Sequence, residues 1–254
     1  LKGKLTSIWN YEKQTSPFAR GEYIYYYRND GLQNQYVVYR KKDNLNSSEE
    51  VFLDPNKFSE DGTISLTGLY FSEDGKLISY TISEGGSDWR KAIVMDTETK
   101  QIIGDTLTNI KFSGISWSGN KGFYYSSYDK PEGSELSEYT DRHKLYYHEL
   151  NTDQKSDKTV FGDQREKYRY VSGNVSDDNN FLFISASNLT DGNELYMIDL
   201  RKNSNRIRTI SDDPSTDDYV VDNIYDTVYI FTNYNAPNKR LVKTTLNNLK
   251  RENW

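Results

Sequence analysis

The same structural unit recurs along this chain: an aromatic-rich strand, a tight polar turn, a second aromatic-rich strand and then a further strand. The clearest turns are residues 72–76, 118–122, 176–180 and 222–226, and a leading copy ends in the strand 23–27. The four turns begin at residues 72, 118, 176 and 222, so their spacings are 46, 58 and 46 residues. Repeats of this length, each built from about four short strands, are typical of β-propeller blades.

Each unit continues with a strand of alternating apolar residues, as in residues 91–96, 144–148 and 194–199. Polar turns such as 97–100 and 151–154 close these strands. Period-2 alternation between turns rich in Asp, Asn and Gly indicates antiparallel strands. A β-sandwich also has many short strands, but the regular recurrence favours a propeller. The sequence therefore predicts an all-β fold, a β-propeller of about four to five blades.

Composition narrows the class of protein further. Hydrophobic residues make up only 35%, but 22 Tyr and 10 Phe supply burial area. The formal charge of −6 argues against a nucleic-acid-binding protein, and short basic runs such as Arg40-Lys41-Lys42 are expected to be solvated strand ends. The chain has no cysteine, which fits a cytoplasmic protein, and no apolar run near 18 residues, so no membrane span is expected.

Several short stretches, in order along almost the whole chain, resemble the N-terminal β-propeller of the prolyl oligopeptidase family of serine peptidases. They are residues 29–39, residues 51–56 with 59–66, residues 71–76 leading into Gly86-Ser87-Asp88-Trp89, residues 143–148 with 152–154, and Pro237-Asn238 with Arg240-Leu241. Each match is short, and their order along the chain carries the resemblance.

The resemblance implies a fold and a function. In that family a seven-bladed propeller forms a lid over an α/β-hydrolase domain, which cleaves short peptides after proline. Residues 1–18 would be a linker-like lead and residues 19–254 a partial propeller of four or five blades. The hydrolase domain and its Ser-Asp-His triad would lie beyond residue 254, so the fragment alone is expected to be inactive. Its partners would be short proline-containing peptides and the missing hydrolase domain of the same chain.

Three residues are substrate-binding candidates through the resemblance. Tyr124 occupies a position where the family usually has Phe and where an aromatic ring contributes to an outer substrate subsite. Asp88 and Arg240 are expected to approach each other near the substrate entry, where a carboxylate and a guanidinium could pair. The alternatives are packing between blades for Tyr124, and a structural pair or unpaired turn residues for Asp88 and Arg240.

The sequence also shows which chemistry to expect within the chain. A hydrolase of this kind needs Gly-x-Ser-x-Gly at a strand-to-helix turn, and the nearest approach is Gly85-Gly86-Ser87-Asp88-Trp89. Trp replaces the second Gly there, and the segment joins two strands, so Ser87 is not expected to be a nucleophile. His143 and His148, five residues apart, should point to opposite faces of a strand as polar strand positions.

Other sites are not expected. Acidic pairs in turns, such as Glu73-Asp74 and Asp177-Asp178, should cap or solvate those turns, with a calcium site as the alternative. No phosphate-binding loop or dinucleotide fingerprint occurs, so neither a metal nor a cofactor is predicted. Two other functions remain open, namely a free-standing propeller that binds proteins or peptides and another enzyme of the wider peptidase clan.

Overall fold

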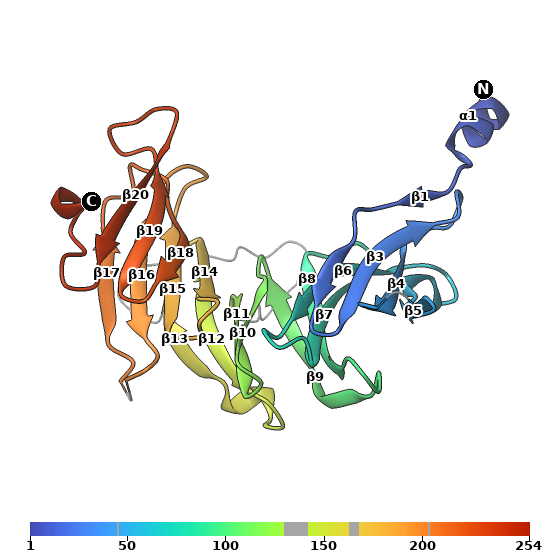
Figure 1. Ribbon diagram of the computed structural model, residues 1–254, viewed down its shortest axis with the longest axis horizontal. Helices are drawn as coiled ribbons and strands as arrows, with labels where there is room; N and C mark the ends of the chain where they lie inside the picture. The colour runs from blue at the N-terminus through green and yellow to red at the C-terminus, as the bar shows by residue number, and fades with distance from the viewer. Residues whose placement is uncertain (45, 130–141, 163–167, 203) are drawn as a thin grey trace. The chain divides into compact units, whose positions relative to one another are not determined.

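The computed structural model describes residues 1–44, 46–129, 142–162, 168–202 and 204–254. Antiparallel strands form five successive sheets, and the chain divides into two compact units, Leu1–Thr108 and Asn109–Trp254 (Figure 1). Each sheet is formed by strands that are consecutive in sequence. This arrangement agrees with the predicted all-β class, because short polar turns can only join neighbouring antiparallel strands.

The first unit contains two sheets, except that the last three residues of the second sheet, 109–111, belong to the second unit. In the first sheet β3 pairs with β1, β2 and β4, and β4 pairs with β5; the second sheet has the order β6-β7-β8-β9. The first-sheet strands are β1 (Lys13–Gln14), β2 (Phe18–Arg20), β3 (Tyr23–Asn29), β4 (Val37–Lys42) and β5 (Glu50–Leu53). The second-sheet strands are β6 (Ile64–Phe71), β7 (Leu77–Glu84), β8 (Trp89–Asp96) and β9 (Ile102–Lys111), and the 3-10 helix η1 (Pro55–Lys57) precedes them.

An aromatic core joins the two sheets of the first unit. Tyr25 on β3 is fully buried and packs on Phe52 of β5 and Phe71 of β6, with ring centroids 5.1 and 4.7 Å away. Ile78 and Tyr80 of β7 belong to the same buried cluster. The many tyrosines of this sequence therefore supply core area, as their abundance suggested.

Arg40 was predicted to be a solvated strand end, and this prediction was wrong. Its side chain is only 2% exposed, and its guanidinium lies 4.1 Å from the centre of the Tyr23 ring. Nε donates to Glu50 at 2.6 Å, and Nη1 donates to the carbonyl of Thr97 at the end of β8. Of the basic run Arg40-Lys41-Lys42, only the two lysines are exposed. A residue of the first sheet thus fastens the backbone of the second.

The second unit contains the third, fourth and fifth sheets, with orders β10-β11-β12-β13, β14-β15-β16-β17 and β18-β19-β20. The third-sheet strands are β10 (Ile115–Ser118), β11 (Gly122–Ser127), β12 (Lys144–Glu149) and β13 (Lys158–Phe161), with the 3-10 helix η2 (Gln154–Ser156). The fourth-sheet strands are β14 (Tyr170–Val175), β15 (Phe181–Ser187), β16 (Glu194–Asp199) and β17 (Ile207–Ser211). The fifth-sheet strands are β18 (Asp218–Ile224), β19 (Thr227–Thr232) and β20 (Arg240–Thr245), followed by the 3-10 helix η3 (Arg251–Asn253).

Strand β15 shows how the fourth sheet is buried on both faces. Leu182 and Ile184 belong to a cluster shared with the third sheet, whereas Phe181 and Phe183 belong to a cluster shared with the fifth. Successive side chains of a strand point to opposite faces, so alternate residues enter different cores. A nearly continuous apolar strand is the expected consequence of covering both faces, and this explains the run Phe181–Ile184.

Two of the repeated turns, at residues 72–76 and 176–180, share one hydrogen-bond pattern. The hydroxyl groups of Ser72 and Ser176 accept from the backbone N–H five residues later at 3.0 Å and donate to Asp74 and Asp178, respectively. Asn179, at the fourth turn position, has a φ of 56°, where Asn and Gly are tolerated best. These turns were predicted from the sequence, and their local bonding explains why their residues recur.

The fourth turn is shorter than predicted. Residues 222–226 were expected to form it, but β18 continues to Ile224, which pairs with Thr227. Only Tyr225 and Asp226 lie between the two strands, and Tyr225 adopts a φ of 51°. A two-residue connection needs positive φ and matches the twist of the strands it joins.

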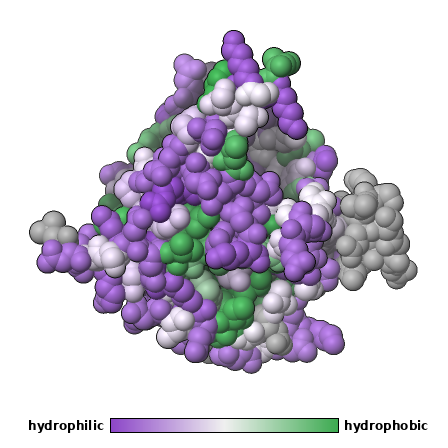
Figure 2. Space-filling model, turned by 90° about the vertical axis from the view of Figure 1, so that its right-hand side faces the viewer, coloured by the Kyte–Doolittle hydropathy of each residue, from purple (hydrophilic) through white to green (hydrophobic). Residues whose placement is uncertain are grey.

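The two ends of the chain differ in how they pack. The helix α1 (Lys2–Trp9) has no buried residue, although β1 pairs with β3. After β20, Leu246, Leu249 and Trp254 pack on the core between the fourth and fifth sheets. The surface drawn in Figure 2 is mostly hydrophilic with a few hydrophobic areas. None of the described helices is long and apolar enough to cross a membrane.

Replacing Arg40 with Met should lower the free energy of unfolding by about 2 kcal/mol, because the Thr97 carbonyl loses its donor and the stacked guanidinium is removed. The half-exposed Glu50 stays solvated, which keeps the loss below that of a fully buried pair. The exposed neighbour offers a matched control, since Lys41→Met should change stability by less than about 0.5 kcal/mol. Urea denaturation followed by tryptophan fluorescence measures both variants, and equal losses would contradict the role given to Arg40.

Candidate functional site

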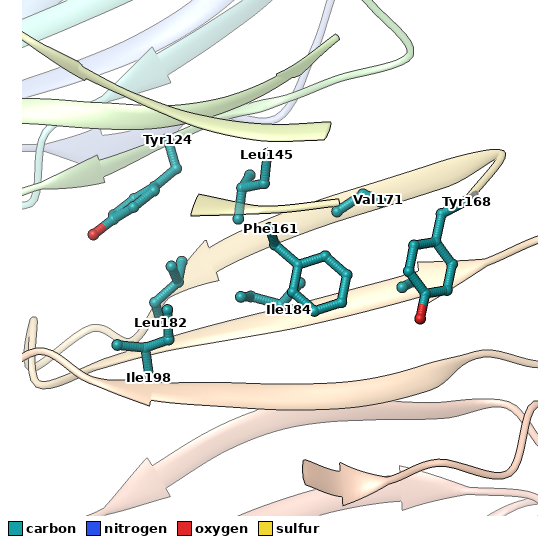
Figure 3. Packing of buried hydrophobic residues seen from close by; sticks show 9 residues of the cluster. Tyr124, Leu145, Phe161, Tyr168, Val171, Leu182, Ile184 and Ile198 are labelled. Atoms are coloured by element: carbon teal, nitrogen blue, oxygen red, sulfur yellow. The ribbon is translucent and has the colours of Figure 1, made fainter. Parts of the chain in front are cut away.

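Tyr124 lies in the core between the third and fourth sheets (Figure 3). It projects from β11, is 7% exposed, and packs with Leu145 of β12 and Leu182 of β15. The Tyr147 ring lies beside it at 5.0 Å, and burial raises the pKa of Tyr124 to about 12. This is the packing between sheets that the sequence left open as the alternative, and contact with a substrate stays a prediction.

Asp88 and Arg240 are both exposed, but they belong to different units. Asp88 lies in the turn between β7 and β8, and Arg240 is the first residue of β20, where its backbone pairs with Thr232. Within the described part of its own unit, neither side chain has an ion pair. The approach of the two side chains that the resemblance implies therefore stays a prediction.

Ser87 has a local structural role. Its hydroxyl accepts from the N–H of Trp89 at 3.1 Å, and its carbonyl accepts from the hydroxyl of Ser83 at 2.6 Å. Gly85 and Gly86 have φ values of 59° and 74°, so the segment is a hairpin turn between β7 and β8. A nucleophile elbow joins a strand to a helix, and this turn joins two strands.

His143 links three segments of the second unit. Its Nδ1 accepts from the N–H of Val171 on β14 at 2.8 Å, and its Nε2 lies 2.9 Å from the carbonyl oxygen of Lys111. The first bond requires a bare Nδ1 and the second a protonated Nε2, so the ring is the neutral Nε2–H tautomer. The side chain is fully buried, and this burial lowers its pKa to about 4. The residue was predicted to be a polar strand position, but it is a buried link between sheets.

His148 is also buried, and it belongs to a different polar cluster, formed with Asp157, Tyr125 and Gln154. Its Nδ1 lies 2.8 Å from one carboxylate oxygen of Asp157, whose other oxygen accepts from the hydroxyl of Tyr125 at 2.7 Å. Gln154 donates to the same hydroxyl at 3.3 Å. The two imidazoles thus have separate partners.

The described residues hold no assembled hydrolytic site. Neither His143 nor His148 contacts a serine hydroxyl there, so no pair of nucleophile and base is formed. Nor is there, among these residues, a group of three or more His, Asp or Glu side chains that could hold a metal ion.

One feature of the second unit was missed by reasoning from the sequence. A groove of about 290 Å³ lies between the fourth sheet and β18, and Asp222 and Asn223 line it. These residues were assigned to a turn, but they lie on a strand whose register shifts between Val220 and Asp222. The interrupted alternation Val220-Val221-Asp222 was the available signal, because an extra residue in a strand marks a β-bulge.

Known proteins resemble this chain over its whole length. The model of the family described as prolyl oligopeptidase, N-terminal beta-propeller domain, matches residues 1–254. The prolyl endopeptidases of Elizabethkingia meningoseptica and Elizabethkingia miricola are 52% and 51% identical over 255 residues, covering 100% of this chain and 36% of each relative. The chain thus spans about a third of the length of these curated relatives.

Solved structures show the same fold. A variant of prolyl oligopeptidase B from Galerina marginata, bound to a 25mer macrocyclization substrate, superposes with a TM-score of 0.88 at 27% identity, covering 96% of this chain and 38% of that one. Its apo form gives 0.83 at 26% identity, covering 96% and 38%. These likenesses confirm the β-propeller fold and the resemblance predicted from the sequence.

The free energy of unfolding should fall as the pH drops from 6.5 to 4, because the pKa of His143 is lower in the folded protein than in the unfolded chain. Its contribution is fully present above pH 6.5, and the loss by pH 4 is on the order of 3 kcal/mol. In His143→Gln, the amide can keep both hydrogen bonds and does not titrate. Urea denaturation at several pH values should therefore show a shallower decline for the variant. Parallel curves for the two proteins would contradict the assignment.

Proposed function

The chain belongs to the prolyl oligopeptidase family, of which it carries the N-terminal β-propeller domain, and on that premise we propose that it is the substrate-gating part of a serine endopeptidase that cleaves short peptides after proline. The observation that carries this proposal is the 52% identity to a prolyl endopeptidase along the entire chain. Fold alone would not suffice, because one fold serves many functions.

In this proposal the chain supplies the gate, and a separate domain supplies the chemistry. Most of the length of the prolyl endopeptidase relatives has no counterpart in this chain. We propose that an α/β-hydrolase domain of the same protein carries the nucleophile, its base and the oxyanion donors. Each sheet is buried against a neighbour within its unit. Such packing suits a rigid scaffold that would limit access to short peptides. A cytoplasmic location, expected from the cysteine-free sequence, stays part of the proposal.

Three residues of the chain are proposed to act on the substrate. Tyr124 would present one edge of its buried ring to an outer subsite. Asp88 and Arg240 would lie near the entry, where opposite charges could pair or select peptides by charge. The exposure of Asp88 and Arg240 supports this role, since neither side chain forms an ion pair with a described residue of its own unit.

The whole protein should hydrolyse a short proline-containing chromogenic peptide, and a serine-directed reagent should abolish the turnover. The 254-residue chain alone should show no turnover, because its described residues hold no pair of nucleophile and base. Turnover by the isolated chain that the reagent blocks would overturn the proposed division of labour. A whole protein that binds peptides without cleaving them would favour a free-standing binding scaffold.

A double-mutant cycle tests the proposed pair. Asp88→Asn and Arg240→Gln should each raise KM for a short substrate about two- to fivefold in the whole protein, and the double variant should lose less than the sum of the two. The pair Glu60→Gln and Lys243→Gln, also exposed and also one in each unit, serves as the control. Additive effects would show that the two side chains act independently.

A further inference from the structure

The groove in the second unit lies between strands that have a free edge. Strand β14 is the first strand of the fourth sheet and β18 the first strand of the fifth, so among the described strands each pairs with a neighbour on one side only. Five consecutive residues, 219–223, line the groove from β18. The shift in register after Val220 leaves Val221 without a partner on β19. Such bulges bend a strand away from its neighbours and commonly lie beside binding sites.

The lining of the groove combines an apolar floor with an acidic rim. Phe183, Leu195 and Val220 are buried or half-buried lining residues that belong to the core between the fourth and fifth sheets. Asp177 and Asp222 also line the groove, and both are exposed. No Lys or Arg is among its lining residues. An apolar floor beside carboxylates matches a cation carried on an apolar stem.

The two carboxylates of this groove lack the cationic partners that some acidic residues of the first unit have. Neither Asp177 nor Asp222 forms an ion pair with a residue that the structure describes. By contrast, a pocket in the first unit is lined by Asp74 and Glu98, which pair with Lys76 at 3.2 Å and with Lys42 at 3.6 Å. The groove's two carboxylates thus have no lysine of this kind beside them, and their charge is open to a ligand.

One nearby cation is already committed. Lys239 lies 5.7 Å from the ring of Tyr219, a lining residue, but its ammonium pairs with Asp217 at 3.3 Å. Asp217 does not line the groove. Lys239 therefore leaves the charges of Asp177 and Asp222 unbalanced.

Asn223 adds an unsatisfied hydrogen-bond acceptor to the lining. It is 8% exposed, and its amide nitrogen donates to Asp178 at 2.8 Å and to the carbonyl of Tyr225 at 3.2 Å. Its amide oxygen is buried and has no hydrogen-bond partner among the residues that the structure describes. Buried acceptors are normally bonded, so an unpaired one beside a groove suits a ligand that brings N–H donors.

We propose that this groove binds a basic peptide residue, with its ammonium or guanidinium group at Asp177 and Asp222 and its aliphatic stem on Phe183, Leu195 and Val220. The basic residue would belong to the peptides that the protein admits, so the biological role rests on the proposed function. The interaction would add a preference for peptides that carry a positive charge. This preference would be modest, because the carboxylates are exposed, and salt would weaken it.

Direct binding tests the proposal in the whole protein. The probes are acetyl-Gly-Lys-Gly-amide and its norleucine counterpart, which share the apolar stem and differ in the charge. Neither contains proline, so neither should be consumed. In an NMR titration at low salt, the lysine peptide should bind about three- to tenfold more tightly than the norleucine peptide. The double variant Asp177→Asn/Asp222→Asn should lose this preference, and Asp191→Asn/Asp212→Asn, two exposed carboxylates outside the groove, should keep it.

Equal affinity for the two probes, or a preference unchanged in Asp177→Asn/Asp222→Asn, would overturn the proposal. Circular dichroism and the thermal midpoint establish that the variants are folded, which is expected because all four residues are exposed. A second measurement compares kcat/KM for proline-containing peptides with lysine or norleucine upstream, where the groove should favour lysine. A protein that cleaves neither substrate but still prefers the lysine probe would refute the peptidase function and support the groove.

Discussion

Burial of sheet faces is the constraint on which the rest of this structure depends. An antiparallel sheet with two apolar faces is not stable by itself in water, so each of its faces must be covered by a neighbouring sheet. In the second unit, β15 sends Leu182 and Ile184 into one core and Phe181 and Phe183 into another. The fourth sheet is therefore held between the third and the fifth. The same requirement explains why the repeat, rather than any single motif, determines the architecture.

Apolar packing brings sheets together but does not by itself set how one sheet is aligned on the next. Polar links within each unit supply that alignment. Arg40 reaches from β4 to the carbonyl of Thr97 at the end of β8, and His143 joins Lys111 to Val171 of β14. Both side chains are almost fully buried, so an unmet bond would be costly in either place. Buried hydrogen bonds are directional, and they favour one arrangement of two sheets over others that bury similar area.

Most of the residues to which we assign a function in our proposals are ones that the packing leaves exposed. Asp88 and Arg240 are exposed in turns or at a strand end, and Asp177 and Asp222 border a groove. Tyr124 differs, because most of its surface is already used in packing. In our proposal, these charges would let the chain bind and select peptides at its surface. The bond-breaking chemistry belongs, in our proposal, to another domain of the same protein.

The sequence by itself determined the all-β class, most of the repeated turns and the family, because those features are local or lie in order along the chain. Ser176 and Asp178 make their bonds within one turn, so their spacing was readable directly. The tertiary structure alone decided that Arg40 is buried and that Asp222 lines a groove. Arg40 bonds a residue 57 positions away, and a basic run looks the same in sequence whether or not another sheet covers it. The pairing of distant segments decides burial, and no local pattern carries that information.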